Sequence, residues 1–172
     1  IFTDDDELAE IMRSVRIHGG GVNKYQNIRV GLNGRLDTIQ AAILLEKFTI
    51  FKDEVIARNK VADYYRSKIN QHLTTPFTPK NYTSSWAQFS LLAKSNKERN
   101  LYMGRLKKKN IPSMIYYPTP LHMQPVFHHL KYCQGDFPVA EKISNSIFSI
   151  PMHPYLKKEE QDNIINVLNT KI

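Results

Sequence analysis

The segment Gly31-Leu32-Asn33-Gly34-Arg35-Leu36-Asp37-Thr38-Ile39-Gln40-Ala41-Ala42 decides how the rest of the chain is interpreted. Its Asn-Gly pair is a strong turn dipeptide, and taken alone it is best explained as a turn that leads into a helix. Apolar residues then recur at helical spacing, so a helix is predicted from Leu36 to Phe48. We expect Asp37 to cap or salt-bridge near the start of that helix rather than to act in catalysis.

On the N-terminal side of this segment, the acidic run 4–7 supplies a helix cap and first-turn carboxylates. A helix is predicted to follow and to stop at His18-Gly19-Gly20-Gly21, with residues 1–3 as the tail of a strand that enters it. The Gly- and Asn-rich stretch 19–34 is predicted to be an exposed loop. Such a loop is a candidate ligand-binding segment.

On the C-terminal side, helices and strands are predicted to alternate, with prolines between them. This pattern predicts an α+β fold (α/β in the broad sense), in which a small sheet is covered by helices. The predicted helices are 53–69, 97–109, 137–147 and 157–168, and the predicted strands are 86–92, 112–117 and 148–150.

The composition excludes several classes of protein. The 172 residues carry 24 Lys and Arg against 16 Asp and Glu, a net charge of +8, which favours anionic partners in general. No apolar run reaches the roughly 20 residues of a membrane span, and no motif of nucleic-acid-binding proteins is present. We therefore expect neither a membrane nor a nucleic-acid partner. The acidic start and the single Cys133 are typical of a cytoplasmic protein.

The quoted segment closely resembles the signature of the DegT/DnrJ/EryC1/StrS family of nucleotide-sugar aminotransferases. Other stretches are similar to the family in the same order, so the resemblance covers almost the whole chain. They are the opening 1–8, Arg16-Ile17-His18-Gly19, Tyr116-Tyr117-Pro118-Thr119-Pro120-Leu121-His122, Ala140-Glu141 and Ser149-Ile150-Pro151-Met152-His153-Pro154.

The resemblance implies the C-terminal portion of a fold-type I enzyme that uses pyridoxal 5′-phosphate. Residues 1–49 are then expected to be the last strand and helices of the large cofactor-binding domain, and 50–172 the small C-terminal domain. The family's Schiff-base lysine lies in a Ser-Phe-x-x-Lys segment, and no lysine here stands in that context. We expect it upstream of residue 1, so no catalytic residue is assigned and the isolated chain is expected to be inactive.

By the same resemblance, Asn33 is expected to bind the cofactor phosphate of a neighbouring subunit in a homodimer. Arg35 is expected to reach that subunit's substrate, and Tyr116, Tyr117 and His122 to face the sugar. The alternatives are a turn for Asn33, core packing for the two tyrosines and a structural role for His122. No metal site is expected, because His128-His129 lacks additional ligands.

The implied function is transfer of an amino group from glutamate to a keto nucleotide-sugar, with a UDP-linked 3-keto-2-acetamido sugar as the closest resemblance. Its setting would be cell-surface polysaccharide biosynthesis. Two alternatives remain. The chain could be a truncated, non-catalytic remnant that acts only by interaction, or a basic nucleic-acid-binding module, which predicts salt-dependent binding to DNA or RNA.

Overall fold

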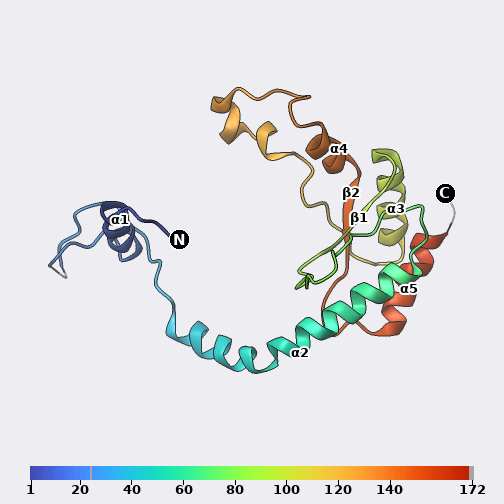
Figure 1. Cartoon of the computed structure of the whole chain (residues 1–172), viewed down its shortest axis with the longest axis horizontal. Coiled ribbons are helices and arrows are strands. Elements are labelled where there is room, and N and C mark those ends of the chain that lie inside the picture. Colours follow the sequence, from blue (N-terminus) through green and yellow to red (C-terminus); the bar gives the residue numbers. More distant parts are fainter. Residues whose placement is uncertain (24, 171–172) are drawn as a thin grey trace. The chain divides into compact units, whose positions relative to one another are not determined.

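The structure is a computed structural model that describes residues 1–23 and 25–170. The chain divides into two compact units, Ile1–Ile50 and Phe51–Ile172, which are described separately (Figure 1). Among the described residues, no helix combines the length and the apolar character needed to span a membrane.

The first unit contains helix α1 (Asp6–Arg16) and a loop that returns beside its end. Asp5 caps α1 by accepting a hydrogen bond from the Leu8 amide at 2.9 Å, which the acidic run predicts. Two isolated antiparallel bridges hold the returning loop, Ile17 with Asn33 and Gly20 with Asn27. Residues 1–3 do not form the predicted strand; within this unit no described strand pairs with them.

Two glycines allow the loop to close on itself. A Cβ atom at Gly31 would lie 2.0 Å from the Gly19 nitrogen, and one at Gly19 would lie 1.7 Å from the Arg29 carbonyl oxygen. Gly19 also has φ +73°, a conformation in which glycine carries no steric cost. Only glycine therefore fits where the two arms of the loop cross.

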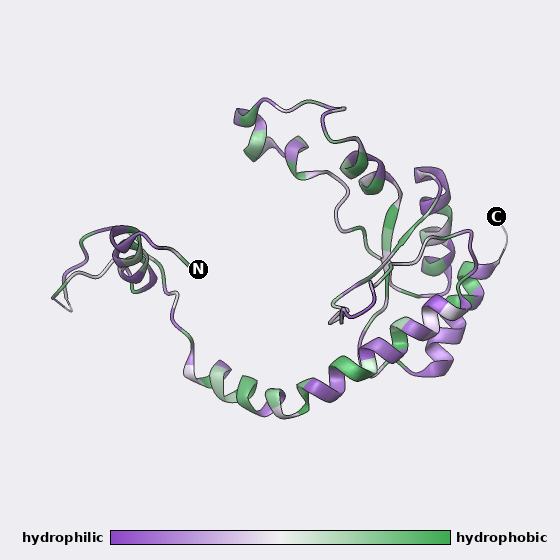
Figure 2. Ribbon diagram, in the orientation of Figure 1, coloured by the Kyte–Doolittle hydropathy of each residue, from purple (hydrophilic) through white to green (hydrophobic). Residues whose placement is uncertain are grey.

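Helix α2 (Thr38–Lys68) is one continuous helix, where two helices were predicted. The prediction of two is wrong because residues 49–52 contain neither Gly nor Pro to stop the first helix. Asp37 caps α2 by accepting from the amides of Ile39 and Gln40, both at 3.0 Å. The first half of α2 is largely hydrophobic in Figure 2, and it carries exposed apolar side chains, namely Ile39, Ile43, Leu44, Leu45 and Phe48.

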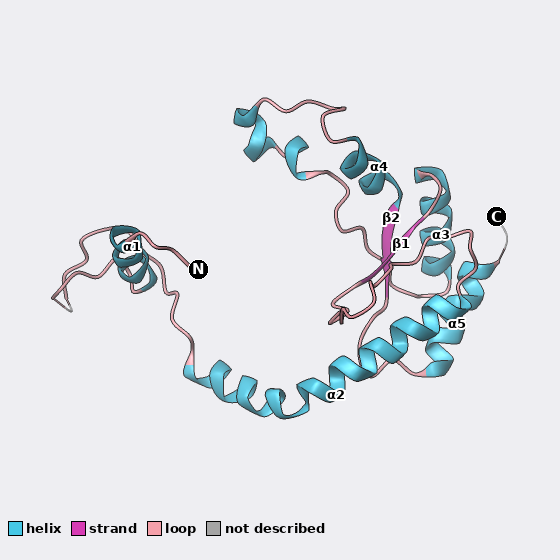
Figure 3. Ribbon diagram, in the orientation of Figure 1, coloured by secondary structure: helices cyan, strands magenta, loops and turns pink. Residues whose placement is uncertain are grey.

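The second unit is built on a two-stranded antiparallel sheet of β1 (Phe89–Leu92) and β2 (Ile147–Ile150), in which Phe89 pairs with Ile150. Helices flank this sheet in Figure 3. The side chains of Phe89, Leu91 and Phe148 are fully buried. They form the core with residues from the end of α2 and from helices α3 (Asn96–Lys108) and α5 (Lys158–Asn169).

The remaining elements of this unit are irregular. Two short 3₁₀ helices, η1 (Leu121–Met123) and η2 (Pro125–Leu130), precede helix α4 (Pro138–Ser146), which leads directly into β2. The predicted strand 112–117 does not form. Only Met114 pairs with Ser149, as an isolated bridge, because Pro112 and Pro118 on either side lack the N–H that a ladder requires.

Candidate functional site

Asn33 and Arg35 form one polar cluster together with His18, in the first unit. The Arg35 Nε donates to Asn33 Oδ1 at 2.9 Å, and the Arg35 Nη2 lies 3.2 Å from His18 Nε2. Arginine can only donate, so the His18 Nε2 accepts this hydrogen bond. His18 thus joins two residues that the sequence singled out.

Backbone hydrogen bonds fix this cluster to the end of α1. The amide of Leu32 donates to Val15 O at 2.9 Å, and that of Gly34 donates to Arg16 O at 2.8 Å. The His18 amide donates to Leu32 O at 3.0 Å. Asn33 is therefore held on both sides, and its position does not depend on its own side chain.

The donors of this cluster fit an anion. The Asn33 amide oxygen accepts from Arg35, so the amide nitrogen, with its two N–H groups, is the atom of this side chain that can donate to a ligand. Arg35 is exposed and retains N–H groups beyond the two that it uses here. Amide and guanidinium donors together suit a phosphate or carboxylate ligand.

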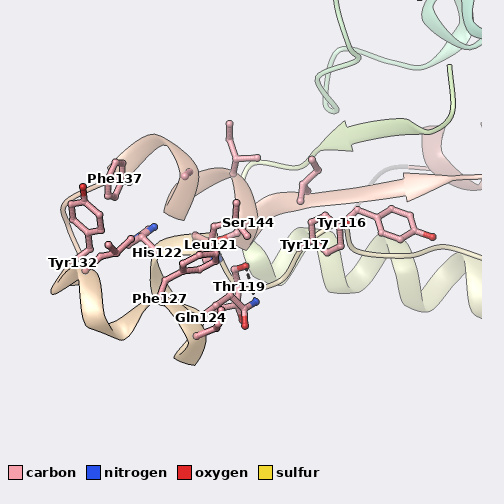
Figure 4. Close-up of a pocket in the computed structure, with 16 residues that line it drawn as sticks. Tyr116, Tyr117, Thr119, Leu121, His122, Gln124, Phe127, Tyr132, Phe137 and Ser144 are labelled. Carbon is pink, nitrogen blue, oxygen red and sulfur yellow. Dashed lines mark hydrogen bonds between the residues drawn. The ribbon is translucent and has the colours of Figure 1, made fainter. Parts of the chain in front are cut away.

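Tyr116, Tyr117 and His122 all line a cavity of about 810 Å³ in the second unit, with the two tyrosines away from His122 (Figure 4). The rings of Tyr116 and Tyr117 meet edge to face with centroids 5.9 Å apart. The lining contains no Lys or Arg, so it offers apolar and aromatic surface with a few polar groups. The other lining residues are Thr119, Pro120, Leu121, Gln124, Val126, Phe127, Leu130, Tyr132, Phe137, Ala140, Ile143, Ser144 and Ile147.

His122 is buried in the wall of this cavity, and Glu141 holds it there. The His122 Nε2 lies 3.1 Å from Glu141 Oε1, and the imidazole and the Phe137 ring have centroids 4.7 Å apart. Because a carboxylate accepts and does not donate, the Nε2 carries the proton. The sequence singled out His122 as a sugar-facing candidate, but its partner Glu141 lies 19 positions away and periodicity does not reveal it.

The carboxylate of Glu141 also accepts hydrogen bonds from backbone amides. The Gly135 N–H donates to Oε1 at 2.8 Å and to Oε2 at 3.1 Å, and the Phe137 N–H donates to Oε1 at 3.3 Å. These amides, the Gly135 N–H above all, lower the pKa of Glu141 below its ordinary value, and His122 lowers it further against the opposing effect of burial. Glu141 is therefore ionised at neutral pH.

The sequence profile of the DegT/DnrJ/EryC1/StrS aminotransferase family matches residues 1–169. The chain belongs to this family. Membership accounts for the order of the motifs along the chain, because the segment 31–42 and the segment 116–122 both fall inside the matched region.

Two relatives in the family are similar over most of this chain. A UDP-2-acetamido-2-deoxy-3-oxo-D-glucuronate aminotransferase of Pseudomonas aeruginosa is 41% identical over 91% of this chain and 42% of its own length. A DegT DnrJ EryC1 StrS aminotransferase from Brucella abortus has a crystal structure that superposes with a TM-score of 0.80, at 44% identity over 97% of this chain and 44% of the other.

A further solved structure contains a cofactor. NtdA from Bacillus subtilis with bound cofactor PMP has a TM-score of 0.75 and 27% identity, and the match covers 96% of this chain and 40% of NtdA. This chain therefore spans less than half the length of the family members that it matches.

Proposed function

We propose that the complete protein is a pyridoxal-phosphate-dependent aminotransferase that moves an amino group from glutamate to a keto nucleotide-sugar in the cytoplasm. The observation that carries this proposal is the 41% identity to an aminotransferase of a UDP-linked 3-oxo sugar, over 91% of this chain. By that similarity the substrate is a UDP-linked 3-keto-2-acetamido sugar or uronic acid. The product would serve cell-surface polysaccharide biosynthesis.

In this proposal, Asn33 binds the cofactor phosphate of the partner subunit in a homodimer. Support comes from its amide nitrogen, which is left to donate because the amide oxygen accepts from Arg35. Asn33 would help to hold the cofactor, which when bound would supply the reversible carrier chemistry for the amino group. This chain contributes a hydrogen-bond donor to the cofactor phosphate and the loop that holds this donor in place. The Schiff-base lysine is proposed to lie in the segment before residue 1.

Arg35 is proposed to reach the nucleotide-sugar bound by the partner subunit, and the cavity residues are proposed to face the sugar. A guanidinium pairs well with a carboxylate or a diphosphate, and Arg35 is oriented by two hydrogen bonds, to Asn33 and to His18. Tyr116, Tyr117 and His122 offer aromatic faces and a few polar atoms, which suit the less charged parts of such a substrate.

The test uses the complete protein expressed from its full reading frame. We expect the purified protein to show the absorbance of a lysine-bound cofactor, to lose it on addition of glutamate, and to regain it on addition of a UDP-linked 3-keto-2-acetamido sugar. Borohydride reduction followed by peptide mapping should place the modified lysine outside residues 1–172. A reading frame without a Ser-Phe-x-x-Lys segment upstream, or a protein inert to every keto nucleotide-sugar, would refute the proposal.

A further inference from the structure

The turn 133–137 and the buried His122 are joined by a single carboxylate, that of Glu141 near the start of α4. Gly135 has φ +100°, a conformation that favours glycine, and it directs its N–H to both carboxylate oxygens. Asp136 closes the same turn by accepting from the Cys133 amide at 2.7 Å. The turn is therefore an ordered element in spite of its exposure.

The carboxylate also takes over the capping of α4. Phe137 is the N-cap residue, and its own side chain makes no capping hydrogen bond. Glu141 instead reaches back one turn and accepts from the Phe137 N–H at 3.3 Å. A negative charge in the first turn of a helix is favourable with respect to the helix dipole. One side chain thus fixes the start of α4, the turn before it and η1.

These contacts determine the wall of the cavity. Phe137 packs on His122, and the Tyr132 ring meets the Phe137 ring edge to face with centroids 5.0 Å apart. His122, Tyr132 and Phe137 all line the cavity, and Figure 4 shows them together at one end of it. The Glu141 side chain is 18% exposed, against 7% for His122, and Glu141 is not among the lining residues.

We propose that Glu141 is a positioning residue for the nucleotide-sugar, because it holds His122 and the turn 133–137 so that the aromatic wall is formed before the substrate arrives. This inference rests on the proposed function of the cavity. Glu141 acts through the residues that it holds and does not touch the substrate. A preformed wall lowers the entropic cost of ordering these residues on binding. Loss of the preformed wall should therefore weaken the binding of the sugar.

The test compares Glu141→Ala and Glu141→Gln in the complete aminotransferase, with Glu159→Gln as the control. Glu159 is an exposed acid in the first turn of α5, outside the cavity. Each variant is measured in the glutamate half-reaction and in the sugar half-reaction, from the absorbance of the bound cofactor. Hydrogen–deuterium exchange of the peptide that contains the Gly135 and Phe137 amides reports directly on the turn.

We expect Glu141→Ala to raise the KM for the sugar about tenfold, the loss expected for one hydrogen bond to a charged group, with little change in kcat. The glutamate half-reaction should stay within about twofold of wild type, and the two amides should exchange about tenfold faster. Glu141→Gln keeps an oxygen acceptor for the Gly135 N–H, so it should restore most of the protection and part of the affinity for the sugar.

Other outcomes distinguish the positioning role of Glu141 from general damage to the enzyme and from failure of the proposed function. Unchanged exchange in Glu141→Ala, or faster exchange with an unchanged KM for the sugar, would overturn the positioning role. Equal losses in both half-reactions would also overturn it, because they indicate general damage rather than a local wall. A wild-type protein that converts no keto nucleotide-sugar overturns the proposed function, and the positioning role with it. In that case the exchange data still establish whether Glu141 holds the turn.

Discussion

The substitution Arg35→Lys tests whether the geometry of the guanidinium, rather than its charge alone, serves the substrate. In the structure Arg35 uses two nitrogens at once, Nε toward Asn33 at 2.9 Å and Nη2 toward His18 at 3.2 Å. Its planar shape holds the other N–H groups in fixed directions, in which they can donate to a ligand. A lysine ammonium is a point charge on a flexible stem, so it cannot satisfy both neighbours and a ligand in a fixed direction.

The size of the effect follows from the hydrogen bonds that a lysine fails to make. A hydrogen bond to a charged group contributes about 1.5–3 kcal/mol, and Arg35 is exposed, so the lower end of that range applies. Loss of one such hydrogen bond corresponds to about a tenfold fall in kcat/KM, and loss of two to about a hundredfold. We expect Arg35→Lys to fall between these values for the nucleotide-sugar.

The assay is the sugar half-reaction of the complete enzyme, followed from the absorbance of the cofactor, with Arg13→Lys as the matched control. Arg13 is an exposed arginine of α1, its side chain 68% exposed, which pairs with Glu10. The control should retain wild-type rates. An Arg35→Lys enzyme with an unchanged kcat/KM for the sugar would show that charge alone suffices and would refute the reasoning. An equal loss in the glutamate half-reaction would show that Arg35 does not serve the nucleotide-sugar specifically.

Three further predictions concern the cofactor, the loop and pH. Asn33→Ala should raise the Kd of pyridoxal phosphate about tenfold in an absorbance titration, because it removes the donating amide nitrogen; unchanged affinity would contradict the assignment. Gly19→Ala should lower Tm by about 5 °C or more, since its Cβ would meet the Arg29 carbonyl oxygen at 1.7 Å and its φ is +73°; an unchanged melting curve would argue against the crossing of the two arms. The pKa of Glu141 lies below its ordinary 4.5, so protection of the Gly135 amide should persist at neutral pH and be lost only as pH falls through that lowered pKa. Loss of protection between about pH 7 and 5, after correction for intrinsic exchange rates, would contradict this.

Local signals predicted most of the helices. Asp5 caps α1 by accepting from the Leu8 amide at 2.9 Å, as the acidic run predicts, and α3 begins at Asn96, close to the predicted start. The apolar spacing of Ile164, Ile165 and Leu168 predicted a buried face for α5, and all three are buried. Caps and periodicity succeed because they involve residues within a few positions of one another.

Features set by distant residues were not predictable in this way. Residues 112–117 look like a strand, but only Met114 pairs, in an isolated bridge with Ser149, which lies far along the chain. The contacts of Arg35 and those of Glu141 were not predictable for the same reason. The contact of His18 with Arg35 depends on the path of the loop between them, and Glu141 was visible only as part of a motif, without His122 or Gly135 as partners.

The crossing of the loop arms at Gly19 and Gly31 has a consequence for protein engineering. The stretch between these glycines carries side chains open to solvent, such as those of Val22 and Val30, whereas Asn33 and Arg35 follow the crossing and are tied to the end of α1. We therefore expect the tip of the loop to accept extra residues, a fluorophore or an affinity tag after Val22 while Asn33 and Arg35 keep their place. The missing side chains of Gly19 and Gly31 are what let the two arms cross between that tip and the cluster.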